Sequence, residues 1–220
     1  MALRGMAQAN MDLGIFQETK CTDGISTRDS AGYSVVAMDA PSRHRGGVAI
    51  FYWPSPIFAV EAVHQFGPNI IGFQLATGAR RSYIIGCYLA PNDTSTIESV
   101  VAALKEWPQG TTLIVARDLN TTLSDPENDG RGTEIVAALT EVGLEDMVAH
   151  FLLRQRRWCR ERRTWSMVQE GKVFRSWTDY ILGTYRRLFW NISVRDPRHN
   201  TDHYMVLGCL HSAPKREHVR

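Results

Sequence analysis

The stretch Ile114–Asn120, with the sequence IVARDLN, is an apolar run that leads directly into a carboxylate and an amide. The continuous apolar residues 112–116 predict a buried β-strand. An aspartate just after a strand usually ends a turn or caps a helix, so Asp118 by itself indicates little. However, other polar groups also follow apolar runs elsewhere along the chain. Together these segments indicate a functional site more strongly than any one of them does alone.

Four further segments repeat this arrangement of an apolar run followed or interrupted by ionisable groups. They are Ile15–Thr19 (IFQET), Tyr88–Asn92 (YLAPN), Thr178–Leu182 (TDYIL) and Asn200–Tyr204 (NTDHY). Carboxylate and amide oxygens on a rigid frame are the ligands that Mg²⁺ prefers. The histidine in the last segment adds a group that titrates near neutral pH. Together the segments predict one metal-assisted catalytic site.

The rest of the chain predicts short strands joined by turns, with few helices. Strands are expected at 13–17, 33–38, 47–52, 70–75, 83–88, 112–116, 165–168, 177–182 and 204–210, and helices at 95–107 and 134–142. This pattern favours an α/β fold of packed mixed sheets with helices outside, rather than a parallel doubly wound sheet. No linker interrupts residues 1–210, which predicts a single domain, and residues 211–220 are expected to form a flexible tail.

Composition narrows the function classes. The chain has 220 residues, of which 44% are hydrophobic, which is typical of a folded globular protein. Residues 1–149 carry 10 basic and 17 acidic side chains, net −7, whereas residues 150–220 carry 15 and 6, net +9. The acidic residues of the first range would attract cations, and the basic residues of the second range would attract polyanions such as nucleic acids.

Four cysteines without a CxxC pair argue against a disulfide framework or a zinc site, and favour a reducing compartment. The sequence contains neither an apolar run of about 18 residues nor a signal-peptide pattern. We therefore expect an intracellular protein, nuclear or cytoplasmic, without a membrane partner.

In this combination the segments resemble the endonuclease/exonuclease/phosphatase superfamily, and most closely the apurinic-type endonuclease domains of non-LTR (LINE-type) retrotransposons. The matching motifs are Gln17-Glu18-Thr19, Tyr88 to Asn92, Asp118-Leu119-Asn120, Thr164-Trp165, Asp179-Tyr180 and Thr201-Asp202-His203. The resemblance covers about residues 1–210. It implies a four-layered α/β/β/α sandwich of two mixed sheets, like that of DNase I, with the active site at one end of the sheets.

The resemblance also implies a metal-dependent, DNA-nicking endonuclease of retrotransposon origin, with Mg²⁺, or Mn²⁺ in its place, as the cofactor and DNA as the partner. A reverse transcriptase domain of the same parent polyprotein is a further partner that it implies. The family motifs assign the metal to Glu18 and Asp202. They assign to His203, oriented by Asp179, either the stabilisation of charge developing on the phosphate or the role of general base. They assign the positioning of water and phosphate to Asp118 and Asn120. Phosphate contacts fall to Tyr88, Asn92 and Thr164.

Two departures from the family pattern stand out. By the family pattern, this sequence is expected to begin inside the helix that precedes Glu18, without the family's first strand and its metal-site asparagine, which would leave one sheet with an open edge. Arg117 replaces the glycine before Asp118. We expect its guanidinium to pair with Asp118 or to repel the cation, and the alternative is that it points to solvent.

Six arginines surround Trp158 just before Thr164. They are Arg154, Arg156, Arg157, Arg160, Arg162 and Arg163. This segment predicts a phosphate-contacting surface, chiefly Arg156, Arg157 and Arg160, with an aromatic ring that stacks on a base. The alternative is an ordinary solvated loop.

Three other functions remain open from the sequence. The first is an enzyme of the same superfamily that acts on a non-nucleic-acid phosphoester such as an inositol phosphate or sphingomyelin. The second is a catalytically impaired remnant that binds nucleic acid, and the third is a fragment that folds poorly. The arginine segment favours DNA over the first of these alternatives.

Overall fold

The structure is a computed structural model, and the following statements refer to the residues that it describes. These are 6, 10–22, 26–30, 32–78, 80–91, 95–108, 111–121, 130–154, 164–195, 203 and 205–211. Among the predicted site residues, Asn92, Arg156, Arg157, Arg160 and Asp202 lie outside them.

A six-stranded mixed sheet forms one layer. Its strands, in spatial order, are β5 (Ala59–Gly67), β6 (Ile70–Thr77), β7 (Arg80–Tyr88), β8 (Thr112–Asp118), β12 (Asp179–Gly183) and β9 (Glu145–Asp146). Neighbouring strands are antiparallel except for β7 and β8, which are parallel. A parallel pair requires a crossover, and the helix α2 (Ser95–Lys105) lies in that connection. The central strand β8 is therefore paired on both sides.

The second layer has two parts. One is a four-stranded antiparallel sheet of β1 (Leu13–Gln17), β4 (Val48–Tyr52), β3 (Tyr33–Ala37) and β2 (Ser26–Ser30), in that order. The other is the antiparallel pair of β13 (Phe189–Arg195) and β14 (Met205–Leu210), which follows the short 3-10 helix η2 (Arg186–Leu188). Within the described ranges, no strand pairs with the edge of β1 that faces away from β4.

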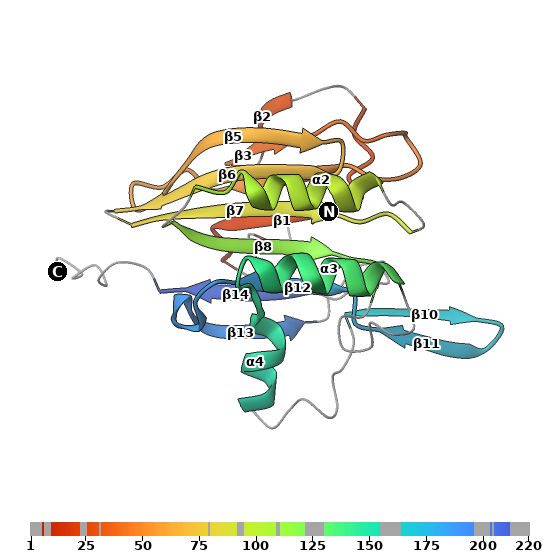
Figure 1. The fold of residues 1–220 in the computed structure, drawn as a ribbon. Helices are drawn as coiled ribbons and strands as arrows, with labels where there is room; N and C mark the ends of the chain where they lie inside the picture. Colours follow the sequence, from red (N-terminus) through yellow and green to blue (C-terminus); the bar gives the residue numbers. More distant parts are fainter. Residues whose placement is uncertain are drawn as a thin grey trace.

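Helices and one hairpin complete the described part of the chain. Besides the helical residue Met6, its helices are α2, α3 (Gly130–Glu141) and α4 (Met147–Arg154). Figure 1 shows α2 and α3 side by side in front of the six-stranded sheet, and α2 packs on β5 and β6. The buried side chains Ile97, Val100 and Leu104 give α2 its apolar face. The hairpin of β10 (Trp165–Gln169) and β11 (Lys172–Ser176) extends away from the sheets.

Close packing at one glycine shows how the two sheets meet. A Cβ atom on Gly86 of β7 would lie 2.7 Å from Ile15 of β1 and 3.5 Å from Val48 of β4, so the sheets pack face to face. Side chains alternate along a strand, so Gly14 lies on the opposite face of β1, where the fully buried Met6 contacts it. Met6 has helical backbone geometry and covers this outer face of β1. The expected α/β/β/α sandwich is confirmed.

Several elements were not predicted from the sequence: the strands β2, β5, β9, β11 and β13, and the helix α4. The side chains of β5 are mostly exposed, and its pairing with β6 shifts register at two places, so its sequence lacks a regular apolar alternation. No described helix is long and apolar enough to span a membrane.

The contact at Gly86 predicts that Gly86→Ala destabilises the fold. The added methyl group would meet side chains of both sheets, and such overpacking costs roughly 1–3 kcal/mol in the free energy of unfolding. Gly67→Ala is the matched control, because a Cβ there would lie 3.8 Å from its nearest neighbour, Ser99. Urea unfolding of the two variants measures the difference. Equal stability of the two would contradict the close packing of the sheets.

Candidate active site

The ends of three neighbouring strands bring three predicted site residues into one row. The register pairs Asp118 of β8 with Tyr88 of β7 on one side and with Asp179 of β12 on the other. Residues directly opposite each other in a sheet project from the same face. The three side chains therefore lie together at one end of the six-stranded sheet, although the chain separates Tyr88 from Asp179 by 91 positions.

Glu18 joins this row from the other sheet. It follows β1 directly, and the hydroxyl of Tyr88 donates a hydrogen bond to its Oε1 atom. The Nζ atom of Lys20 lies 3.8 Å from Oε2 on the other side of the carboxylate. Glu18 has a φ angle of +53°, which non-glycine residues rarely adopt. Such strain concentrates at functional sites, where the surrounding structure holds the residue in place.

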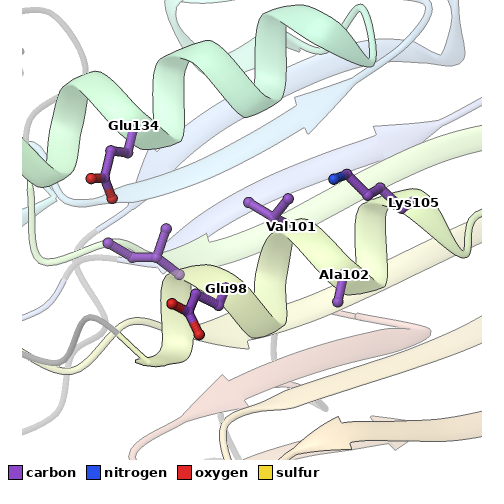
Figure 2. Close-up of a pocket in the computed structure, with 6 residues that line it drawn as sticks. Glu98, Val101, Ala102, Lys105 and Glu134 are labelled. Atoms are coloured by element: carbon purple, nitrogen blue, oxygen red, sulfur yellow. The ribbon is translucent and has the colours of Figure 1, made fainter.

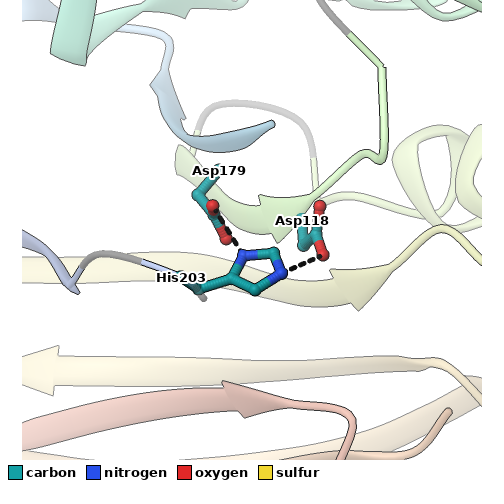
Figure 3. A group of neighbouring side chains, drawn as sticks. All are labelled: Asp118, Asp179 and His203. Carbon is teal, nitrogen blue, oxygen red and sulfur yellow. Dashed lines mark hydrogen bonds and ion pairs between the residues drawn. The ribbon is translucent and has the colours of Figure 1, made fainter. Parts of the chain in front are cut away.

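His203 completes the group and lies between two carboxylates, as Figure 3 shows. Its Nδ1 atom is 3.0 Å from Oδ2 of Asp179, and its Nε2 atom is 3.9 Å from Oδ2 of Asp118. The contact between His203 and Asp179 has the length of a hydrogen bond, and the separation between His203 and Asp118 is within ion-pair distance. An Nδ1–H that donates to Asp179 orients the ring with Nε2 toward Asp118. A backbone bridge to Trp165 also ties His203 to β10.

Asn120 holds Asp118 in place. Its backbone N–H donates to Oδ1 of Asp118 at 2.9 Å, and its side-chain Nδ2 donates to the carbonyl of Leu89 at 3.0 Å and to Oδ2 of Asp118 at 3.4 Å. The φ angle of Asn120 is +46°, a conformation that asparagine tolerates better than most residues. Asn120 thus connects the ends of β7 and β8.

Thr164 lies in the interior behind Asp179 and holds its backbone in place. Its side chain is fully buried, and its Oγ1 atom accepts hydrogen bonds at 2.9 Å from the backbone N–H groups of both Thr178 and Asp179. The hydroxyl of Thr178 donates to Oδ2 of Asp179 at 3.2 Å. The structure therefore gives Thr164 a role in fixing the start of β12, and its contact with phosphate stays a prediction.

Burial and repulsion make Asp118 hard to ionise. Burial, and then the charge of Asp179, raise the pKa of Asp118 to about 7, whereas the backbone hydrogen bond from Asn120 and the charge of His203 act in the other direction. The charge of Glu18 also raises it, which shows that Glu18 lies near. The pKa of Tyr88 is raised by burial and by its hydrogen bond to Glu18.

These donors fit a divalent cation. Ligand atoms of Asp118, Asp179 and His203 all lie within 4.8 Å of one another, and Glu18 presents its carboxylate to the same end of the sheets. Carboxylate oxygens held close together repel one another, and a hard cation such as Mg²⁺ relieves that repulsion. Asp202, the second predicted metal ligand, lies outside the described residues.

Two of the expectations for Arg117, the ion pair with Asp118 and the position in solvent, are wrong, and repulsion of the cation stays a prediction. Its side chain is 2% exposed, so it does not point to solvent, and it forms no ion pair with Asp118 among the described contacts. Alternation along β8 places Arg117 on the face opposite Asp118, where Cys87, Tyr180 and Asp146 surround it. Within the described part of the chain, none of its guanidinium nitrogens has a partner at ordinary hydrogen-bond geometry, although the Cys87 thiol and the charge of Asp146 lie near enough to favour its charged form. Burial lowers the pKa of Arg117 to about 10.

Sequence reasoning missed Lys20 as a neighbour of the Glu18 carboxylate. Its position two residues after Glu18 is visible in the sequence, but only the turn after β1 brings the two side chains together. A separate groove of about 360 Å³ lies between α2 and α3, lined by Ile97, Glu98, Val101, Ala102, Lys105 and Glu134, and Figure 2 shows five of these side chains with labels. None of the predicted site residues lines it.

Comparison with solved structures supports the expected resemblance. The endonuclease domain of TRAS1, a telomere-specific non-LTR retrotransposon, superposes with a TM-score of 0.71 at 19% identity, over 96% of this chain and 90% of that one. The human Nocturnin catalytic domain with bound sulfate gives 0.64 at 16% identity, over 94% and 83%. TDP2 from D. rerio complexed with single-strand DNA product gives 0.57 at 15% identity, over 93% and 87%.

These similarities show a common fold, and the resemblance to the endonuclease/exonuclease/phosphatase superfamily, including a retrotransposon endonuclease domain, is confirmed at that level. No family model matches the sequence, and no curated protein matches it.

The buried guanidinium of Arg117 predicts that Arg117→Met stabilises the protein. A buried charge without hydrogen-bond partners costs free energy that a methionine of similar length avoids, so the free energy of unfolding should rise by roughly 1–3 kcal/mol. Arg81→Met is the control, because Arg81 is exposed and its ion pair with Glu61 spans 3.8 Å. A loss of stability in Arg117→Met would show that the guanidinium has a stabilising partner.

The raised pKa of Asp118 predicts how stability depends on pH. The folded protein keeps a proton on Asp118 up to about pH 7, whereas the unfolded chain releases it near pH 4. Stability without metal should therefore fall as pH rises from 4 to 7, by at most about 1.4 kcal/mol per pH unit for this group. Asp118→Asn should flatten the dependence in EDTA, measured by urea unfolding at a series of pH values.

Asp146 has a pKa raised to about 6 and contributes a smaller fall of the same sign, so Asp146→Asn is the comparison variant. An unchanged slope in Asp118→Asn would contradict the burial of an ionisable group there.

Proposed function

We propose that this protein is a metal-dependent phosphodiester hydrolase that nicks DNA. The observation that supports it best is the placement of His203 between Asp179 and Asp118, with Glu18 brought to the same end by Tyr88. Carboxylates and a histidine in such an arrangement are suited to hydrolysis of a phosphate ester. The fold shared with the TRAS1 endonuclease domain agrees with this assignment.

Asp118 and His203 have different roles in the proposed reaction. Asp118 is proposed to accept a proton from the attacking water, since burial and the charge of Asp179 raise the pKa of this carboxyl toward the neutral range. Asn120 holds that carboxylate while the water oxygen forms its bond to phosphorus, the bond to the leaving sugar oxygen breaks, and that oxygen takes up a proton from solvent. His203, held by Asp179, presents Nε2 to the phosphate and opposes its developing negative charge when protonated.

Glu18 and Asp202 are the residues that would hold the cation. Asp118, Asp179 and His203, whose ligand atoms lie within 4.8 Å of one another, keep the roles in proton transfer, positioning and charge stabilisation given above. When bound, Mg²⁺ or Mn²⁺ offsets negative charge on the phosphate. Tyr88 orients the Glu18 carboxylate through its hydroxyl, and Lys20 lies on the other side of the same carboxylate. Asn92 is proposed to contact the phosphate, whereas Thr164, which is fully buried, acts by holding the backbone of Asp179.

DNA is the proposed substrate because of the charge pattern. The arginine segment directly precedes Thr164 in the chain, and the Thr164 hydroxyl accepts a hydrogen bond from the backbone N–H of Asp179 in the site. The segment therefore leads into the site along the chain. Arg156, Arg157 and Arg160 are proposed to contact the DNA backbone on the approach to the site. TDP2, with the same fold, has been solved with a single-strand DNA product.

The proposal predicts that the protein converts supercoiled plasmid to the nicked form in Mg²⁺ and stops in EDTA. His203→Ala should reduce the rate by about 10²–10³-fold, which is the usual contribution of one group that stabilises charge developing in the transition state. His64→Ala is the matched control, because this exposed histidine lies on the edge strand β5 and contacts Phe66. Gel electrophoresis over time measures the rates.

Two results would contradict the proposal in different ways. Retention of DNA on a gel without nicking would identify a binding remnant. Hydrolysis of a small phosphoester with intact plasmid would indicate another substrate class.

A further inference from the structure

Asn69 is a buried polar residue that the proposed reaction does not use directly. It lies between β5 and β6 with 2% of its surface exposed. Its side-chain Oδ1 atom accepts a hydrogen bond from the backbone N–H of Gly47 at 2.9 Å. Its backbone carbonyl accepts from the N–H of Tyr88 at 3.0 Å. Asn69 therefore contacts the turn before β4 in one sheet and the end of β7 in the other.

The turn that Asn69 holds is the one that shapes the Glu18 segment. The carbonyl of Gly46 accepts from the N–H of Lys20 at 3.0 Å, and that of Gly47 accepts from the N–H of Thr19 at 3.3 Å. Gly46 and Gly47 have φ angles of +81° and +87°, which only glycine adopts readily. A Cβ on Gly46 would lie 2.6 Å from the Oδ1 atom of Asn69, so the fit is close.

The contacts form a closed ring. From Asn69 one path runs through Gly47 to Thr19 and so to Glu18, and the other runs through Tyr88, whose hydroxyl bonds the Glu18 carboxylate. A ring of hydrogen bonds between two sheets limits how far its members move relative to one another. Glu18, whose backbone is strained, depends on such support.

We propose that Asn69 is the positioning residue that sets the Glu18 carboxylate against Tyr88 and the end of the six-stranded sheet, and thereby sets the affinity of the site for a divalent cation. The inference deepens the proposed function, because it concerns the same metal site. Only the nicking measurement depends on the proposed DNA-nicking activity. The alternative is that Asn69 only stabilises the turn, which would lower overall stability without changing metal affinity.

The test compares Asn69→Leu, which removes the acceptor at similar volume, with Asn69→Asp, which keeps it. Thr184→Val is the matched control, because the Oγ1 atom of Thr184 likewise accepts from a backbone N–H, that of Leu113 at 3.2 Å, at the opposite end of β8. Three quantities are measured on each protein. They are the dissociation constant for Mn²⁺ alone, the Mg²⁺ concentration for half-maximal nicking, and hydrogen exchange of the backbone amides.

Asn69→Leu should raise the Mn²⁺ dissociation constant and the half-maximal Mg²⁺ concentration by at least about tenfold, as is typical when the support of a metal ligand is lost. The amides of Thr19, Lys20 and Gly47 should exchange faster. Asn69→Asp should stay within about threefold of the unmodified protein, and Thr184→Val should change stability but neither metal value.

Unchanged Mn²⁺ affinity and unchanged exchange at Thr19 and Lys20 in Asn69→Leu would overturn the inference, whatever the nicking result. Failure of the unmodified protein to nick plasmid would overturn the proposed function, while Mn²⁺ affinity and exchange still decide the role of Asn69. If Asn69→Leu does not fold, Asn69→Ser replaces it, because the shorter side chain does not reach the Gly47 amide.

Discussion

The pairing of β8 with its two neighbours is the constraint on which the site depends. The parallel register with β7 and the antiparallel register with β12 place Tyr88, Asp118 and Asp179 in one row. A shift of one residue in either pair would turn a side chain to the opposite face. The same alternation sends Arg117 to that opposite face, where it is buried without a hydrogen-bond partner among the described residues. The two pairings of β8 thus explain both the row of site residues on one face and the separation of Arg117 from Asp118.

The site also requires the two sheets to stay close at one end. Gly86 allows β7 to pack directly on β1 and β4, and the hydroxyl of Tyr88 then reaches Glu18. The close approach has an electrostatic cost, because burial and neighbouring carboxylates disfavour ionised Asp118. Hydrogen bonds from Asn120 and an ion pair with His203 offset part of that cost. The remaining repulsion favours a site that binds a cation.

Much of the supporting structure consists of uncharged polar groups behind the ionisable ones. Thr164 fixes the backbone at Asp179, and Asn69 connects the Glu18 turn to Tyr88. Positive φ angles at Glu18 and Asn120 show that the chain accepts backbone strain where these side chains are presented. Such contacts limit how far the strand ends that present these side chains move relative to one another.

The sequence by itself determined the α/β sandwich and most of the strands near the site. Apolar periodicity marks the buried strands, and the motifs at their ends identify Glu18, Asp118 and His203 as site residues. It could not place Arg117, because adjacency in sequence suggested contact with Asp118, whereas the pleat of β8 separates the two side chains. It also did not reveal the roles of Asn69 and Thr164. These roles depend on hydrogen bonds between segments 22 and 14 residues apart, and only the packing of the strands brings such groups within reach.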